Sequence, residues 1–371
     1  MNSLLRVGLL FGGASVEHEV SVKSARGVAG GLDPARFECV PIGVTGDGRW
    51  LAPEASAAIL HGEASRVETA AEGDGTRVVV DPGGAGLLLV SSGSEARAVP
   101  IDVLFPVLHG WGGEDGRLQG AMELAGVPCV GAGVLGSALG MDKAASKTIF
   151  AAKGLPVGPW RFFTREEYRL APRETERRLA SGLVFPLFVK PSNGGSSVGI
   201  TKVAAPEGLA AAVEAALECD PRVVAEAAID AREVECAVLG NDRPEASIPG
   251  EIIPSREFYD YAAKYLDETS QLLIPAPIPA ATAETVRRLA VEAFRALDLA
   301  GMARVDFFVE RSTGEVLLNE ANTLPGFTGI SMYPKLWEAS GLPFPELLDR
   351  LVRLALERAS SARSRATRFR G

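Results

Sequence analysis

Residues Ala303-Arg-Val-Asp-Phe-Phe-Val-Glu-Arg-Ser-Thr-Gly-Glu-Val-Leu-Leu-Asn-Glu-Ala-Asn322 form two apolar runs around a central turn. The runs, Val305 to Val309 and Val316 to Leu318, flank Arg311-Ser312-Thr313-Gly314. Apolar runs separated by a short glycine-containing turn are typical of a β-hairpin. Gly314 suits the left-handed position that closes a three-residue loop. The stretch therefore predicts an antiparallel pair of strands.

The predicted loop determines which side chains face each other across the hairpin. The expected pairs are Arg311–Glu315, Phe308–Leu318 and Asp306–Glu320. Asn322 lies two residues beyond Glu320 and shares its face because strand side chains alternate. Arg304 lies beside this group of two carboxylates and an amide. The opposite face is apolar, so both faces are expected to be largely buried; it carries Val305, Phe307, Val309, Leu317 and Ala321.

Two buried carboxylates need a compensating charge, because burying an unpaired carboxylate costs several kcal/mol or more. Oxygen ligands without a nearby His or Cys favour a hard cation, Mg²⁺ before Zn²⁺. An alternative is a salt-bridge patch of Arg304, Asp306 and Glu320 without metal. The hairpin alone leaves both interpretations open.

The composition describes an ordinary globular protein. The chain has 371 residues, enough for two or three domains, with 47% hydrophobic and 23% charged residues. A formal net charge of −9 argues against nucleic acid as the main partner. Four scattered cysteines favour reduced thiols. The N-terminal apolar run is broken by Arg6 and is expected to be a strand. No apolar run reaches membrane-spanning length, so we expect a cytoplasmic protein.

The N-terminal part has the pattern of an α/β domain. Residues 4–11 predict a strand that breaks at Gly12-Gly13 before a helix, but the dinucleotide-binding spacing Gly-x-Gly-x-x-Gly is missing. Glu17 follows this strand, at the edge where open α/β sheets bind ligands, although a helix-dipole role would also explain it. Further strands are expected at 37–44 and 101–108. Residues 62–100 are interpreted as a loosely patterned insertion with short strands at 78–80 and 87–90.

Two glycine-rich loops follow predicted strands. His109 begins the first, residues 109–116, where glycines would let backbone approach a ligand closely. Residues 128–136 predict another strand and turn, and Asp142 is a plausible cap for a helix that begins at Lys143. The second loop, residues 191–199, follows Lys190 and can wrap phosphates in backbone N–H groups, although it is not a Walker A loop.

The rest of the chain supplies a further loop and two helices. Residues 259–265 contain three tyrosines in a polar connection, which indicates a binding or lid loop. Amphipathic helices are expected at 282–297 and 344–356. The arginine-rich stretch 363–371 is expected to be a solvated tail that frays.

Taken together, these segments resemble the D-alanine–D-alanine ligases of the ATP-grasp superfamily. The resemblance runs over nearly the whole chain and is carried by residues 12–21, 108–116, 141–143, 190–199, 259–265, 304–306 and 319–331. It implies an α/β protein with the ATP-grasp fold and three domains. Their expected ranges are 1–139 for a Rossmann-like N-terminal domain, 140–224 for a central domain with the glycine-rich loop, and 225–371 for a C-terminal domain with the metal site and lid loop.

The resemblance also implies roles for individual residues. ATP phosphates would be held by Lys143, Lys190 and Ser197, and the adenine and ribose by Glu226, Ala227, Ile229 and Glu233. The metal ligands would be Asp306, Glu320 and Asn322, which agrees with the hairpin argument. The substrate set would comprise Glu17 and His109 around the first D-alanine and Lys264, Gly326, Ser331 and Met332 around the second. Two places depart from the family: several relatives have a lysine at the position of Ala227, and many have a glycine at Asp230-Ala231.

The implied reaction joins two D-alanine molecules through an acyl phosphate, with ATP and Mg²⁺ (two ions, replaceable by Mn²⁺) and with a homodimer as the expected assembly. Arg304 would stabilise the oxyanion, and the catalytic set would include Ser331. A proton must leave the incoming ammonium, and the sequence does not choose among Glu17, Ser196 and Tyr265.

Four other functions share some of these sequence features. The nearest are a ligase that adds D-lactate or D-serine and another ATP-grasp carboxylate–amine ligase. A nicotinamide-dependent oxidoreductase is disfavoured by the missing glycine spacing. A non-catalytic ATP-binding module is disfavoured because every expected active-site position is filled.

Overall fold

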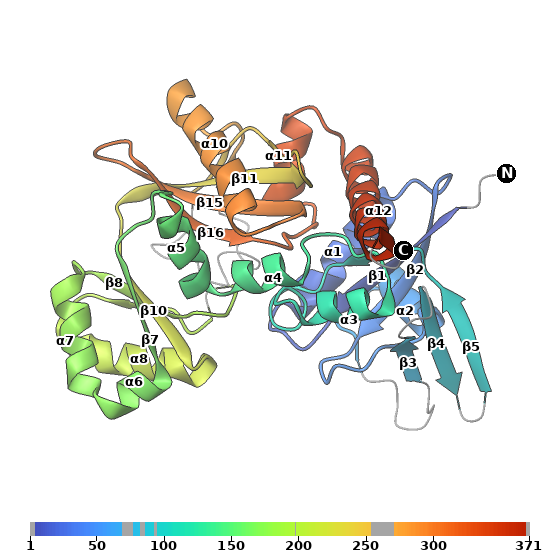
Figure 1. The fold of residues 1–371 in the computed structure, drawn as a ribbon, viewed down its shortest axis with the longest axis horizontal. Helices are drawn as coiled ribbons and strands as arrows, with labels where there is room; N and C mark the ends of the chain where they lie inside the picture. The colour runs from blue at the N-terminus through green and yellow to red at the C-terminus, as the bar shows by residue number, and fades with distance from the viewer. Residues whose placement is uncertain are drawn as a thin grey trace.

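The structure, a computed structural model, describes residues 4–68, 77–81, 86–92, 95–196, 198–253 and 271–368. The described strands form four sheets, three of which belong to successive parts of the chain (Figure 1). The N-terminal part lies on the right of the view, the central part at the lower left and the C-terminal part between them at the top. Across these ranges, no helix has the length and apolar character needed to cross a membrane.

The N-terminal part is built on a parallel sheet in the order β2-β1-β6. Its strands are β1 (Leu5–Gly12), β2 (Phe37–Val44) and β6 (Val103–Pro106), and its helices include α1 (His18–Gly31) and α2 (Pro53–His61). The strands are nearly continuous apolar runs because helices cover a parallel sheet. The carboxyl ends of β1 and β6 bring Glu17 and His109 to one edge, as the predicted strands require.

The short strands predicted at 78–80 and 87–90 are confirmed, and they belong to a sheet that was not predicted. A second, antiparallel sheet has the order β3-β4-β5, with β3 (Arg77–Val80), β4 (Leu87–Ser92) and β5 (Glu95–Pro100). Its buried residues Val78, Leu88 and Val90 join the core beside β2. The predicted strand at 128–136 is wrong, because Cys129 makes only an isolated bridge to Leu104 and a helix follows at Val134.

The central part is an antiparallel sheet in the order β7-β10-β8-β9. Its elements are β7 (Trp160–Thr164), α6 (Arg165–Leu170), α7 (Pro172–Gly182), β8 (Leu187–Pro191), β9 (Thr201–Val203), α8 (Leu209–Cys219) and β10 (Arg222–Ala227). Helices α3 (Arg117–Ala125), α4 (Val134–Met141) and α5 (Lys143–Ala152) precede it. Strand β10 spans the predicted domain boundary at 224/225, and both predicted boundaries stay predictions.

The C-terminal part is a larger sheet in the order β14-β13-β11-β15-β16, with β12 paired to β11. Its strands are β11 (Ala231–Gly240), β12 (Glu245–Ala246), β13 (Gly250–Ile253), β14 (Gln271–Leu273), β15 (Gly301–Glu310) and β16 (Val316–Asn322). Helix α10 (Ala280–Ala296) packs on one face, against Val305 and Phe307. On the other face, Ala237 and Leu239 pack against Tyr333, whereas Glu235, Arg304 and Glu320 line cavities.

The predicted hairpin exists as β15 and β16, but its register was only partly right. Asp306 does face Glu320, whereas Phe308 faces Leu317 and not Leu318. The register shifts between Asp306 and Phe307, so Asn319 is an extra, bulged residue on β16. As a consequence Leu318 is buried on the apolar face, and Leu317, predicted there, lies on the other face.

The C-terminal helices fasten the last part of the chain to the first. Helix α11 (Met332–Ala339) precedes α12 (Phe344–Arg368), which runs beyond the predicted end at 356 and includes part of the predicted frayed tail. Phe327 packs edge-on against Phe105 of β6, with ring centroids 5.6 Å apart. Arg358 of α12 donates hydrogen bonds to the carbonyl groups of Cys129 and Gly131. The apolar contact holds the N-terminal sheet against the C-terminal sheet.

Candidate active site

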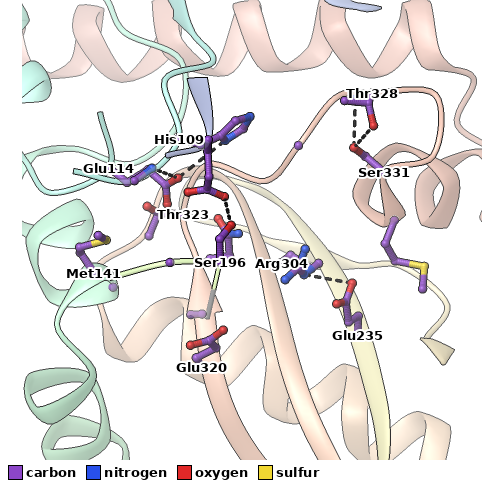
Figure 2. Close-up of a pocket in the computed structure, with 18 of the residues that line it drawn as sticks. His109, Glu114, Met141, Ser196, Glu235, Arg304, Glu320, Thr323, Thr328 and Ser331 are labelled. Atoms are coloured by element: carbon purple, nitrogen blue, oxygen red, sulfur yellow. Dashed lines mark hydrogen bonds and ion pairs between the residues drawn. The ribbon is translucent and has the colours of Figure 1, made fainter. Parts of the chain in front are cut away.

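Two adjoining cavities lie where the three parts of the chain meet. The first has a volume of about 710 Å³ and the second of about 640 Å³. Residues that line both include Lys143, Gly195, Ser196, Glu235, Arg304 and Glu320. Figure 2 shows the first cavity with His109 and Glu114 at the upper left, Thr328 and Ser331 at the upper right, and Arg304 beside Glu235 below them. A ligand in one cavity would therefore meet a ligand in the other near Arg304 and Glu320.

Glu17 and Ser196 meet in the first cavity although they come from different parts of the chain. Glu17 immediately precedes α1 and is only 7% exposed. The hydroxyl of Ser196 donates a hydrogen bond of 2.5 Å to Glu17 Oε1. Ser196 lies in the loop between β8 and β9 with a φ of 50°, which few residues other than glycine adopt. The third member of the predicted set, Tyr265, lies outside the described residues.

His109 is fixed on three sides beneath the same cavity. Its Nδ1 lies 3.1 Å from the carbonyl oxygen of Leu324, and its Nε2 lies 3.2 Å from Ser24 Oγ. Glu114 Oε1 is 3.7 Å from Nδ1. Burial disfavours the imidazolium, but Glu114 and Glu17 outweigh burial and raise the pKa of His109 above its ordinary value. The arrangement places an imidazole with a raised pKa beside a cavity that could hold a carboxylate.

Arg304 stands between the two cavities and is held by two carboxylates. Its Nε and Nη2 lie 2.8 and 2.7 Å from the two oxygens of Asp306, a bidentate pair. Its Nε is also 3.0 Å from Glu235 Oε2. Glu320 instead lies 3.4 Å from Lys143 Nζ. The predicted Arg304–Asp306–Glu320 patch thus has Arg304 paired with Asp306 and Glu235, and Glu320 paired with Lys143.

The two predicted metal-binding carboxylates face each other on the hairpin. Asp306 lies opposite Glu320, and both line the second cavity; Asn322 lies opposite Arg304 and lines the first. Within the described ranges, no group of three or more His, Cys, Asp or Glu side chains is arranged to hold a metal. Two carboxylates and an amide fit Mg²⁺, which protein sites bind through one or two carboxylates and substrate phosphates. The donor set therefore suits a cation that arrives with a nucleotide.

The second cavity carries the lysines expected at the phosphates. Lys190, at the end of β8, lies 2.7 Å from Glu226 Oε2. Lys143, the first residue of α5, donates a hydrogen bond of 2.7 Å to the carbonyl group of Gly194 in the glycine-rich loop. The predicted cap is confirmed, because the Asp142 side chain accepts a hydrogen bond from the Ala145 N–H. Both ammonium groups thus point at the loop and strands that surround this cavity.

A third lysine, Lys147, was not singled out from the sequence. Its side chain is 3% exposed, and its Nζ lies 3.1 Å from Glu226 Oε1. Burial lowers the pKa of Lys147 although Glu226 opposes the effect. Burial would raise the pKa of Glu226, but Lys147 and Lys190 outweigh it and hold that pKa below its ordinary value. Glu226 is therefore a carboxylate with a lowered pKa, held between the side-chain nitrogens of Lys147 and Lys190.

The remaining expected residues are placed as follows. Ala227, Ile229 and Glu233 line the second cavity, and Gly326, Ser331 and Met332 line the first. Ser331 Oγ accepts a hydrogen bond from the Thr328 N–H, and a Cβ at Gly326 would lie 2.7 Å from Ser331 Oγ, so only glycine fits there without displacement. Ser197 and Lys264 lie outside the described residues. Sequence reasoning missed Glu114 and Lys147, since isolated charged residues carry no local signal of burial.

The protein has the ATP-grasp fold. A Rossmann-like sheet is followed by two antiparallel sheets, and a cavity lies between these two. The family model described as "D-ala D-ala ligase N-terminus" matches residues 6–132, and that described as "D-ala D-ala ligase C-terminus" matches residues 149–353. The chain belongs to the D-alanine–D-alanine ligase family.

Named relatives cover nearly the whole chain. D-alanine–D-alanine ligase from Caldicellulosiruptor bescii is 45% identical over 97% of this chain and 97% of its own. The enzyme of that name from a Thermoanaerobacter species is 48% identical over 95% of this chain and 96% of its own. The solved D-alanine–D-alanine ligase from Coxiella burnetii has a TM-score of 0.86 at 37% identity, covering 99% of this chain and 98% of that one. VanG D-Ala:D-Ser ligase from Enterococcus faecalis has a TM-score of 0.81 at 37% identity, covering 95% and 100%.

Proposed function

We propose that this protein uses ATP to join two D-alanine molecules, releasing D-alanyl-D-alanine, ADP and phosphate for the synthesis of peptidoglycan precursors. The observation that carries the proposal is the meeting of two cavities at Arg304 and Glu320 in a chain of this family. One cavity has the lysines and carboxylates that suit a nucleotide, and the other has room for two small amino acids. We also propose that it works in the cytoplasm as a homodimer.

The first step activates a carboxylate that is itself a poor electrophile. A carboxylate oxygen of the first D-alanine attacks the γ-phosphorus of ATP, which forms an acyl phosphate and releases ADP. Lys143 and Lys190 can turn from Gly194 and Glu226 to the phosphates and neutralise the transferred charge. Mg²⁺, or Mn²⁺ in its place, supplies further charge neutralisation when held by Asp306, Glu320 and Asn322, with two ions expected.

The second step forms the peptide bond. The amine of the second D-alanine attacks the acyl phosphate carbon, and the tetrahedral intermediate expels phosphate. Arg304 lies between the cavities and can stabilise the oxyanion with guanidinium N–H groups. His109 and Glu17 would hold the first substrate, and Lys264, Gly326, Ser331 and Met332 the second.

A base must remove a proton from the incoming ammonium group. The hydrogen bond from Ser196 to Glu17 gives a short route from the first cavity to a carboxylate. Tyr265 is the third candidate for this route. We propose that Glu17, Ser196 and Tyr265 act together in this proton transfer. In the second cavity, the ATP contacts would come from Ser197, Glu226, Ala227, Ile229 and Glu233.

The proposal is tested by measuring ADP release and products with a panel of D- and L-amino acids and D-hydroxy acids. D-Alanine alone should give ADP and dipeptide in equal amounts, and L-alanine should give neither. D-Serine and D-lactate must be in the panel, because a D-Ala:D-Ser ligase is as similar in sequence as a D-alanine–D-alanine ligase among the solved structures. ADP release that prefers either of them as acceptor over D-alanine would contradict the proposal.

A further inference from the structure

The bulge at Asn319 decides whether the metal-binding carboxylate reaches the cavity. On the turn side of the bulge, Phe307 faces Leu318. If that register continued without a bulge, Glu320 would face Val305 and lie on the buried apolar face. The extra residue restores Glu320 to the face of Asp306. Bulges often re-aim side chains beside active sites in this way.

Lys147 holds this bulge from outside the hairpin. Its Nζ donates a hydrogen bond of 3.0 Å to the carbonyl group of Asn319. The neighbouring N–H of Leu318 donates to the carbonyl group of Pro156 at 2.7 Å. A bulged residue leaves the ladder locally disrupted, so outside partners are needed to fix its backbone. Lys147 supplies the partner adjacent to Glu320.

The same ammonium group joins the bulge to the nucleotide side of the site. Lys147 Nζ lies 3.1 Å from Glu226 Oε1, and Lys190 Nζ lies 2.7 Å from Glu226 Oε2. Helix α5, which carries Lys147, also begins with Lys143, whose Nζ is 3.4 Å from Glu320. One buried side chain thus connects the central sheet, through Glu226, to the hairpin that carries the metal ligands.

We propose that Lys147 is a positioning residue that fixes the Asn319 bulge and so aims Glu320 at the metal that accompanies the nucleotide. The inference rests on the proposed function for its catalytic meaning. The effect of Lys147 on the bulge and on metal affinity does not depend on the reaction, and both can be measured without catalytic turnover. Groups that orient metal ligands are worth about 10- to 100-fold in metal affinity.

The test compares Lys147→Met with the native protein and with Lys153→Met. Lys153 caps the same helix and is exposed, so its variant controls for loss of a lysine from α5. Mn²⁺ binding is measured in the presence of ADP from the electron paramagnetic resonance signal of free Mn²⁺. Lys147→Met should weaken binding about 10- to 100-fold, and Lys153→Met should leave it unchanged. Equal Mn²⁺ binding in all three proteins would overturn the proposal.

Hydrogen exchange separates positioning from general destabilisation. In Lys147→Met without ligand, amides 317–321 should exchange about tenfold faster or more, because a hydrogen bond from a charged donor is lost. Amides of β1 and β2, in the N-terminal sheet, should keep their native rates. A uniform increase throughout the protein would mean a merely structural role and would overturn the proposal.

A second variant keeps the test decisive if Lys147→Met folds poorly. Lys147→Gln retains a donor for the Asn319 carbonyl group but has no charge for Glu226. In Lys147→Gln, amides 317–321 should exchange no more than about fivefold faster than in the native protein, because the bulge keeps an ordinary hydrogen bond. If amides 317–321 of Lys147→Gln exchanged as fast as amides of an unfolded chain, the role of that hydrogen bond would be contradicted. Absence of dipeptide synthesis in the native protein would refute the proposed function while leaving the exchange and Mn²⁺ results to judge Lys147.

Discussion

Replacing Glu320 with Gln tests the metal site with little change in volume. Glu320 faces Asp306 across β15 and β16, and the substitution removes one negative charge from the proposed ligands. A cation bound during phosphoryl transfer contributes several kcal/mol to the transition state. A loss of about 4 kcal/mol lowers the rate about 10³-fold. We therefore expect ligation to be almost abolished.

The fold should hardly respond to the same substitution. The pair of Glu320 with Lys143 spans 3.4 Å, and 32% of the Glu320 side chain is exposed. A pair of this kind contributes only about 0–1 kcal/mol to stability. The melting temperature of Glu320→Gln should thus stay within a few degrees of native, about the shift that 1 kcal/mol causes.

The assay is ADP release with saturating D-alanine and ATP over a range of Mg²⁺ concentrations, with thermal unfolding measured in parallel. Glu315→Gln is the matched control, because Glu315 is exposed on the same hairpin and lines neither cavity. The control should have native activity. Full activity of Glu320→Gln at ordinary Mg²⁺ would refute the assignment of this carboxylate to the metal.

Three further predictions follow from the site. Residues 191–199 and 257–269 should exchange amide hydrogens more slowly with an ATP analogue and D-alanine bound; equal rates would count against closure. Burial would lower the pKa of His109, but Glu114 and Glu17 outweigh it and raise that pKa. His109 therefore contributes stability that is present below about pH 6.5 and is lost as the pH rises through the raised pKa. Urea unfolding of Glu114→Gln should show a smaller decline over that range. Tyr265→His should gain D-lactate ligation chiefly at pH 6, because an imidazole with the ordinary pKa of about 6.5 is then mostly protonated and repels the ammonium group of D-alanine. An unchanged ratio of dipeptide to depsipeptide at pH 6 and pH 8 would contradict this.

Strands with strong local patterns were predicted well. The strand at 37–44 is confirmed at both ends, because an apolar run bounded by charged and glycine-rich turns leaves little freedom. In the sheet of β3, β4 and β5, the first two strands were predicted. Strand β5 was not, since much of it is exposed and its alternation is therefore weak. The length of α12 was underestimated because arginines stabilise a helix without giving an apolar stripe.

The contacts between distant parts of the site were beyond local patterns. The resemblance predicted Glu17 and Ser196 as partners, and their hydrogen bond confirms that they meet. Lys147 carried no signal, because a lysine on an amphipathic helix is usually solvated and its burial depends on Glu226, which is distant in sequence. Charged residues buried by tertiary pairing are found only once the partners are placed.

The hairpin shows why the facing of Asp306 and Glu320 was nevertheless predicted correctly. The predicted three-residue loop is wrong, because the Glu310 N–H donates to the Glu315 carbonyl group and the loop contains one more residue. That difference alone would move Glu320 to the apolar face, where an ionised carboxylate costs several kcal/mol. The bulge at Asn319 cancels it. Turn chemistry fixed the approximate place of the loop, whereas the cost of burying Glu320 selected the register, so the polar and apolar pattern was the stronger constraint.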